Sequence, residues 1–295
     1  MAKTSRKGGT VKAAAEPTRV GDLLRLPSGT VDLDAFDPRR TPGAPGNRAS
    51  TEADFARTAP LLADLQERLY AEGVAGWSRR RLLLLLQGMD TSGKDGTTTH
   101  VAGQVNPQGL RITSFKAPTR AERRHDFLWR IERALPEPGY VGVFNRSQYE
   151  DVLIVRVHSL VPESEWSTRY DRINAFERSL QDDGVHLVKV FLHISKAEQK
   201  ARLLTRLDDP TKQWKYNPGD VDERVLWDEY TAAYADVLSR CNPPGSPWFV
   251  VPADRKWYRN WAVGRLLIEA LQDMTLSYPP AEFDVAAERA RVQSS

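Results

Sequence analysis

The chain has 295 residues, of which 40% are hydrophobic and 27% are charged, values that exclude a wholly disordered, collagenous or membrane-embedded chain. Its 42 basic and 39 acidic side chains leave a net charge of only +3, so affinity for a polyanion must come from local basic clusters. Cys241 is the single cysteine, which excludes an internal disulfide framework and a thiolate zinc cluster and fits a reducing cytoplasm.

The two ends of the chain differ from its middle. Residues 1–50 are rich in Gly, Pro, Ala, Lys and Arg without a sustained apolar period, which predicts a partly ordered basic arm. Such an arm is either a solvated tail or a segment that helps to hold a polyanion or a partner subunit. Residues 51–276 are expected to form one domain, and residues 277–295 a peripheral tail. No signal peptide follows the basic N-terminus, which favours a cytoplasmic location.

Helix and strand patterns alternate along the middle of the chain. A helix with an apolar side from Phe55 to Leu69 comes first, and Leu82 to Leu86 is then a continuous apolar run, far shorter than the roughly 20 residues of a membrane helix. This alternation predicts an α/β fold in which helices flank both faces of a parallel sheet, a three-layer sandwich. The expected strands are 81–87, 110–115, 140–144, 185–194 and 248–251. Of the expected helices, one ends near Gly73, one passes through His100 and one covers 121–135. Two more begin at Ser195 and Asp220 with capping-box spacing.

A glycine-rich motif follows the first strand. The run from Gly88 to Gly96 matches G-x-x-x-x-G-K and precedes a helix. Its glycines let backbone amides turn toward phosphate oxygens, the helix N-terminus adds partial positive charge, and Lys94 adds a full one. A chance glycine-rich turn is the alternative, but the strand before and the helix after favour a phosphate site. The predicted phosphate-binding residues of this loop are Gly88, Thr91, Ser92, Gly93, Lys94, Asp95 and Gly96.

Two carboxylates accompany this loop. Asp95 stands where a P-loop usually has a Ser or Thr whose hydroxyl binds Mg²⁺, and Asp90 lies inside the loop. Carboxylate oxygens suit a hard cation, and two anions beside phosphates would repel them unless metal or basic groups intervened. The sequence therefore predicts a metal site at Asp90 and Asp95, for Mg²⁺ or alternatively Mn²⁺.

Polar residues also follow the strand at 140–144. Strand ends face the ligand crevice in open α/β sheets, so Asn145, Arg146 and Ser147 are expected to point toward the glycine-rich loop. Arg146 would then clamp a phosphate. The alternative is a capping or salt-bridged surface arginine.

A basic stretch follows the helix that begins after Ser195. Asp208-Asp209-Pro210 interrupts this stretch, which predicts a helix end followed by a mobile lid at about residues 205–220. Arginines of such a lid stabilise charge on a transferring phosphoryl group, whereas a solvated charged loop is the alternative. The basic residues concerned are Arg202, Arg206, Lys212 and Lys215.

From Phe55 to Met274 the chain resembles the polyphosphate kinase 2 family. The motifs that carry the resemblance occur in the right order along this whole length. They are Gly88 to Gly96 with His100, Val105 to Gly109, His125 to Arg130, Phe144 to Ser147, Arg169-Tyr170 with Ile173-Asn174 and Phe176-Glu177, Phe191 to Ser195, Asp209-Pro210 with Lys212 and Trp214-Lys215, and Trp248 with Arg255 to Arg259.

This resemblance implies a thymidylate-kinase-like P-loop kinase fold with a helical lid, Mg²⁺, and reversible phosphoryl transfer between polyphosphate and AMP, ADP or ATP. It implies catalytic roles for Asp90 and Lys94 in the Walker A motif, Arg146 in the Walker B motif, and Arg202 and Arg206 in the lid. Asn145 stands where many members have Asp, so no metal-binding carboxylate is carried over to that position.

The Asn-Arg-Ser form is similar to the single-domain class III group, whose members accept AMP as well as ADP. The resemblance further implies a homodimer or homotetramer. The expected partners are polyphosphate and adenine nucleotides, with guanine nucleotides as an open alternative, and neither nucleic acid nor membranes are expected. Lys116 and Arg120 are expected to extend a basic track for polyphosphate. The alternatives are an ATP-dependent nucleoside monophosphate kinase and a non-catalytic polyanion-binding scaffold.

Overall fold

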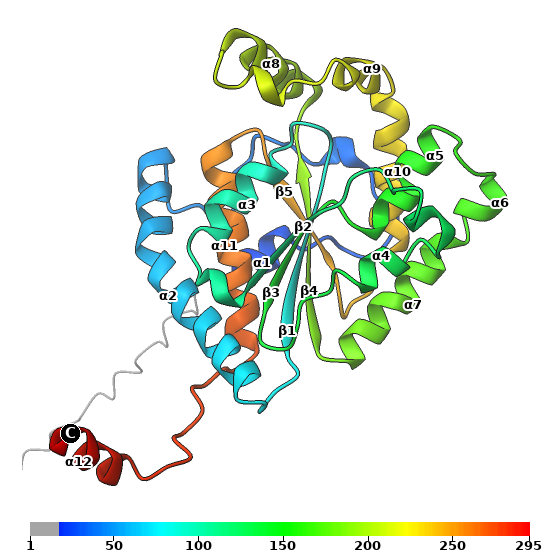
Figure 1. The fold of residues 1–295 in the computed structure, drawn as a ribbon. Coiled ribbons are helices and arrows are strands. Elements are labelled where there is room, and N and C mark those ends of the chain that lie inside the picture. Colours follow the sequence, from blue (N-terminus) through cyan, green and yellow to red (C-terminus); the bar gives the residue numbers. More distant parts are fainter. Residues whose placement is uncertain (1–17) are drawn as a thin grey trace, which may run out of the picture.

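Five parallel strands form the central sheet of the computed structural model, which describes residues 18–295 (Figure 1). In space the strands follow the order β2-β3-β1-β4-β5. All of β1 (Arg81–Gln87) is buried, as a continuous apolar strand covered on both faces should be. The other strands are β2 (Leu110–Ser114), β3 (Val141–Asn145), β4 (Val185–His193) and β5 (Trp248–Pro252).

Helices cover both faces of this sheet. The helices α2, α3 and α11 lie on one face and α7 and α10 on the other, while α8 and α9 project beyond the edge formed by the carboxyl ends of the strands (Figure 1). The helices are α1 (Val20–Leu24), α2 (Arg48–Val74), α3 (Lys94–Ala102), α4 (Trp129–Glu132), α5 (Ile154–Val157), α6 (Glu163–Trp166), α7 (Arg169–Asp182), α8 (Lys196–Asp208), α9 (Gly219–Val225), α10 (Trp227–Arg240), α11 (Lys256–Asp273) and α12 (Val285–Ser294).

The strand order places two loops of the predicted site side by side. β1 pairs with β3 on one side, where Leu86 is the register partner of Asn145, and with β4 on the other, where Gln87 is the partner of Phe191. The loops that leave β1 and β3 therefore emerge together at one edge of the sheet. Ligands of open α/β sheets bind at such a point.

The predicted parallel sheet between helical layers is confirmed, whereas two local predictions are wrong. The expected helix at 121–135 is two short pieces, because His125 is extended and the Asp126 carboxylate accepts from the Leu128 amide at 3.0 Å. The expected capping box at Asp220 is absent, because α9 begins at Gly219 and the Asp220 side chain pairs with Arg206 instead.

The segment before α2 packs against the domain. Val20 and Leu24 of α1 are buried, and the amides of Val20 and Gly21 donate to the Glu269 carboxylate of α11 at 2.9 and 2.8 Å. Val20, Leu24, Leu26, Val31 and Leu33 of the segment expected to form a partly ordered arm join the core, while most of its other described residues are exposed or half-buried, and residues 1–17 lie outside the described residues. At the other end, α12 lies away from the sheet (Figure 1).

Within residues 18–295, no helix has both the length and the apolar character needed to cross a membrane.

Candidate active site

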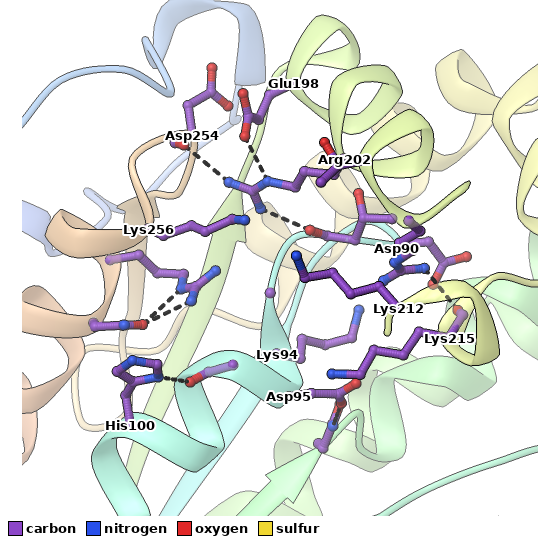
Figure 2. Close-up of a pocket in the computed structure, with 18 of the residues that line it drawn as sticks. Asp90, Lys94, Asp95, His100, Glu198, Arg202, Lys212, Lys215, Asp254 and Lys256 are labelled. Carbon is purple, nitrogen blue, oxygen red and sulfur yellow. Dashed lines mark hydrogen bonds and ion pairs between the residues drawn. The ribbon is translucent and has the colours of Figure 1, made fainter. Parts of the chain in front are cut away.

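A polar cavity opens at the carboxyl edge of the sheet (Figure 2). Its walls come from the glycine-rich loop, the end of β3 and the loop that follows β2. The lid with α8 and the first turns of α11 and α2 complete the lining. Basic side chains therefore face the loop from several elements that are far apart in the sequence. Those that line the cavity are Arg48, Lys94, Lys116, Arg146, Arg202, Arg206, Lys212, Lys215, Arg255, Lys256 and Arg259.

Lys94 is the first residue of α3 and its ammonium lies inside the glycine-rich loop. Its Nζ donates to the carbonyl oxygens of Gly88 at 2.7 Å and Met89 at 3.3 Å. Burial, together with repulsion from Arg146, lowers the pKa of Lys94 below its usual range, although nearby carboxylates oppose the shift. The ammonium is held without a buried carboxylate in direct contact, so an entering phosphate would supply the missing negative charge.

Two of the four described non-glycine residues with positive φ lie at this cavity. Thr91 has φ of 63° and Arg146 has φ of 65°, and neither is a glycine. A β-branched residue in the left-handed region is a marked outlier, and strain of this kind persists where the surrounding structure enforces it. Gly93, which has φ of 104°, supplies the remaining left-handed turn before α3. These backbone conformations give the loop its tight turn and direct the Arg146 side chain toward the loop.

The two predicted metal-site carboxylates lie on either side of Lys94. Asp90 pairs with Arg146 at 3.0 Å, and Asp95 accepts a hydrogen bond from the side-chain amide of Asn145. Burial alone would lower the pKa of Arg146, but Glu150 and Asp90 hold it above its usual value. Among the described residues no three His, Cys, Asp or Glu side chains gather as a metal cluster. Two carboxylates nevertheless fit Mg²⁺, which commonly takes one or two of them together with substrate phosphates.

Arg202 is oriented toward the loop and not toward the open cavity (Figure 2). Its Nε donates to Glu198 at 2.8 Å, and its Nη1 donates to the carbonyls of Thr91 and Ser92 at 2.8 and 2.9 Å. The Nη2 donates to the carbonyls of Ala253 and Asp254. All five N–H groups of the guanidinium are engaged, so in this conformation Arg202 has no donor left for a substrate. The catalytic role expected for Arg202 stays a prediction.

The other lid residues bind mainly to the lid itself. Arg206 pairs with Asp220 at 3.1 Å and Lys212 pairs with Asp209. Lys212 and Arg206 still line the cavity, as does Lys215. These exposed or half-buried pairs contribute little to stability in water.

The structure brings most of the predicted site residues together. Three of the others serve the scaffold or lie apart: Ser147 is buried with its Oγ 3.0 Å from the Gln87 amide, the Ser92 side chain is buried without a hydrogen-bond partner, and exposed Arg120 does not reach the cavity. Gly88 begins the glycine-rich loop directly after β1 and has φ of 148°. The predicted residues that line the cavity are Asp90, Thr91, Gly93, Lys94, Asp95, Gly96, Lys116, Asn145, Arg146, Arg202, Arg206, Lys212 and Lys215.

Sequence reasoning on single residues missed the contribution of α11. Lys256 and Arg259 line the cavity, and burial together with Arg202 and Arg259 lowers the pKa of Lys256. A signal was present, because the segment from Arg255 to Arg259 follows β5 and strand ends face the crevice. The start of α2 was missed as well, and only its contact with the cavity reveals Arg48 and Phe55.

A parallel sheet whose central strand leads through a G-x-x-x-x-G-K loop into a helix, with a lid opposite, defines the P-loop kinase class. A family model described as polyphosphate kinase 2 matches residues 47–279, so the chain belongs to the polyphosphate kinase 2 family.

Similar proteins agree with this assignment. The chain is 44% identical over 256 residues to the AMP/ADP-polyphosphate phosphotransferase of Meiothermus ruber, covering 87% of this chain and 94% of that one. It is 45% identical to the ADP-polyphosphate phosphotransferase of Rhodopseudomonas palustris, covering 74% and 78%. The crystal structure of polyphosphate kinase 2 from Arthrobacter aurescens TC1 superposes with a TM-score of 0.92 at 50% identity, covering 97% and 100%.

Proposed function

We propose that the protein transfers a phosphoryl group between inorganic polyphosphate and adenine nucleotides, reversibly, with both AMP and ADP as acceptors. One observation carries the proposal: the glycine-rich loop, Arg146 and the basic lid face a single cavity. The name of the relative from Meiothermus ruber supports the same donor and both acceptors, and that of the relative from Rhodopseudomonas palustris supports polyphosphate and ADP. The breadth of the cavity's basic lining suits two polyanionic substrates at once.

Phosphoryl transfer needs in-line positioning and neutralisation of charge more than covalent chemistry. In this proposal the loop amides and Lys94 hold the oxygens of one substrate at the start of α3. Arg146, at the end of β3, reaches the oxygens of the transferring group. Lys212 and Lys215 approach from the lid and exclude water as it closes. Lys116, which lines the cavity beside β2, would hold the next phosphates of the polyphosphate.

Mg²⁺ would be held by Asp90, assisted by Asp95, and Mn²⁺ would suit the same oxygens. Bound there, the ion neutralises charge on the phosphate oxygens. Asp90 now pairs with Arg146 at 3.0 Å, so a bound ion would compete with this arginine for the carboxylate. Release of Arg146 from Asp90 would leave its guanidinium free to bind substrate.

A cytoplasmic location and a homodimer or homotetramer stay predictions. The buried free thiol of Cys241 is compatible with a reducing compartment. Light scattering of the purified chain would decide the assembly.

The test supplies AMP or ADP separately, with Mg²⁺ and long-chain polyphosphate and without ATP, and identifies the products by chromatography. The proposal predicts ADP and ATP from AMP, and ATP from ADP. Guanine nucleotides offered in the same assay define base selectivity. Product formed from AMP only when ATP replaces polyphosphate would identify an ATP-dependent nucleoside monophosphate kinase. Binding of polyphosphate without any product would identify a scaffold.

A further inference from the structure

The backbone of the glycine-rich loop is held from outside by side chains of α8 and α11. Gln199 Nε2 donates to the carbonyl of Asp90 at 3.1 Å, and Arg202 Nη1 donates to the carbonyls of Thr91 and Ser92. In a trans peptide the carbonyl and the following N–H point in opposite directions. The outward carbonyls of Asp90 and Ser92 therefore leave the amides of Thr91 and Gly93 facing the other way, toward the phosphate site, whereas the Ser92 amide donates to the Met89 carbonyl at 3.0 Å.

Arg259 of α11 reaches the same loop from a second direction. Its Nη1 donates to the carbonyl of Ser92 at 3.2 Å, and its Nη2 donates to Asn260 Oδ1 at 2.8 Å. The residue is only 3% exposed, and no Asp or Glu of residues 18–295 forms an ion pair with it. Burial and the charge of Arg202 lower the pKa of Arg259 to about 9. A buried cation without an anion is costly, so its presence here requires a reason.

Two glycines make room for this guanidinium. A Cβ on Gly93 would overlap Arg259 Nη1, and a Cβ on Gly96 would lie 3.1 Å from Nη2. The guanidinium thus lies against the first turn of α3, where a Cβ would overlap it at Gly93 and would make a tight contact with it at Gly96. Gly96 has no left-handed backbone to explain it, so this close approach is the reason for a glycine at that position.

The carbonyl of Ser92 consequently accepts hydrogen bonds from two guanidinium groups. Charge-assisted bonds to a carbonyl polarise its peptide and strengthen the N–H on the opposite side. That N–H belongs to Gly93, and no described residue accepts a hydrogen bond from it. An amide with a strong dipole and no acceptor beside Lys94 is the donor that a phosphate oxygen would find.

We propose that Arg259, together with Arg202, is a positioning residue that fixes and polarises the Ser92–Gly93 peptide so that the Gly93 amide binds a phosphate oxygen. Neither arginine needs to touch the substrate. This assigns Arg202, which the charge pattern suggested as a lid catalyst, to the support of the loop. The effect on turnover rests on the proposed function, whereas the state of the Gly93 amide in the free protein does not.

The test compares Arg259→Met and Arg259→Lys with the wild type. The first readout is the Gly93 amide resonance of the free, isotope-labelled protein. We expect its proton to shift upfield in Arg259→Met, and to a smaller extent in Arg259→Lys, which keeps a charge but loses the planar fork. The second readout is turnover, where kcat should fall on the order of 100-fold in Arg259→Met, as when an oxyanion donor is lost. The KM for nucleotide should change by less than about threefold.

Guanidinium ion added to Arg259→Met should restore part of both the Gly93 shift and kcat, because it can occupy the vacated space. Arg81→Lys is the matched control: Arg81 is 6% exposed, pairs with Asp183 and starts β1 at the opposite end of the sheet. It should leave both readouts unchanged.

An unmoved Gly93 resonance in a folded Arg259 variant overturns the proposal, as does a fall in kcat without that shift. Should Arg259→Met fail to fold, Arg259→Lys alone decides through the same resonance. A wild-type protein that showed no polyphosphate-dependent turnover would refute the proposed function and leave the Gly93 measurement to decide this inference.

Discussion

Replacing Lys94 by methionine removes the charge at the centre of the loop with little change in volume. At an effective dielectric constant of about 20, an ammonium and a phosphate charge about 4 Å apart attract by about 4 kcal/mol. Lys94 is 9% exposed, so solvent screens this interaction little. If the attraction is realised in the transition state, its loss lowers kcat/KM by about a thousandfold.

The folded state should tolerate Lys94→Met. The lowered pKa of Lys94 shows that its charged form is disfavoured in the free protein, while methionine leaves two carbonyls without a donor. These effects oppose each other, and the melting temperature should stay within about 2 °C of the wild type, equivalent to about 1 kcal/mol for a chain of this length.

The assay measures ATP formed from ADP and polyphosphate, with Mg²⁺, for Lys94→Met and for a control, Lys200→Met. Lys200 is exposed on α8 and does not line the cavity. The control should keep wild-type turnover. A Lys94→Met protein that is folded and retains turnover within about tenfold of the wild type would refute the reasoning, since the electrostatic argument requires a much larger loss.

Three further predictions concern stability and metal binding. Burial raises the pKa of Asp151 from 3.8 to about 6. Between pH 3.8 and about pH 6 the folded protein therefore keeps a proton on this carboxyl group that the unfolded chain has released. The unfolding free energy, measured by urea denaturation, should therefore fall by up to about 3 kcal/mol more in the wild type than in Asp151→Asn as pH rises from about 4 to 7; parallel curves would contradict this. Gly73→Ala places a Cβ 2.5 Å from Gly139 Cα and should cost about 1–3 kcal/mol in thermal unfolding, where an unchanged melting curve would disprove the close approach. Asp90→Asn should weaken Mn²⁺ binding to the free protein about tenfold or more by electron paramagnetic resonance, and equal affinity would remove Asp90 from the metal site.

The sheet could be predicted from sequence because each strand is a buried apolar run between turn signals. The strand at 81–87 coincides with β1, and the strand at 248–251 differs from β5 by one residue. The packing of α1 could not be predicted, because it depends on Glu269, about 250 positions away, which accepts two backbone amides. The helix predicted at 121–135 failed for a local reason: the Asp126 side chain accepts a hydrogen bond from the Leu128 amide and competes with a continuous helix.

Some residues of the candidate site could likewise be predicted from the sequence, and others could not. Lys94 and Arg146 could be predicted, because a motif or a strand end fixes where each side chain emerges. The role of Arg202 could not, since its charge suggested a substrate contact while its position on α8 turns four donors onto backbone carbonyls and the fifth onto the Glu198 carboxylate. Arg259 had no distinguishing pattern as a single residue. Only the packing of α11 against α3 shows that it lies on the Ser92 carbonyl.

The central claim is that the loop from Gly88 to Gly96 holds the phosphates at the start of α3. A crystal structure of the protein with Mg²⁺, ADP and polyphosphate tests it most directly. The account predicts phosphate oxygens bonded to Lys94 Nζ and the Gly93 amide, with the metal at Asp90. Phosphates bound elsewhere, with Lys94 still bonded to the Gly88 carbonyl, would contradict it.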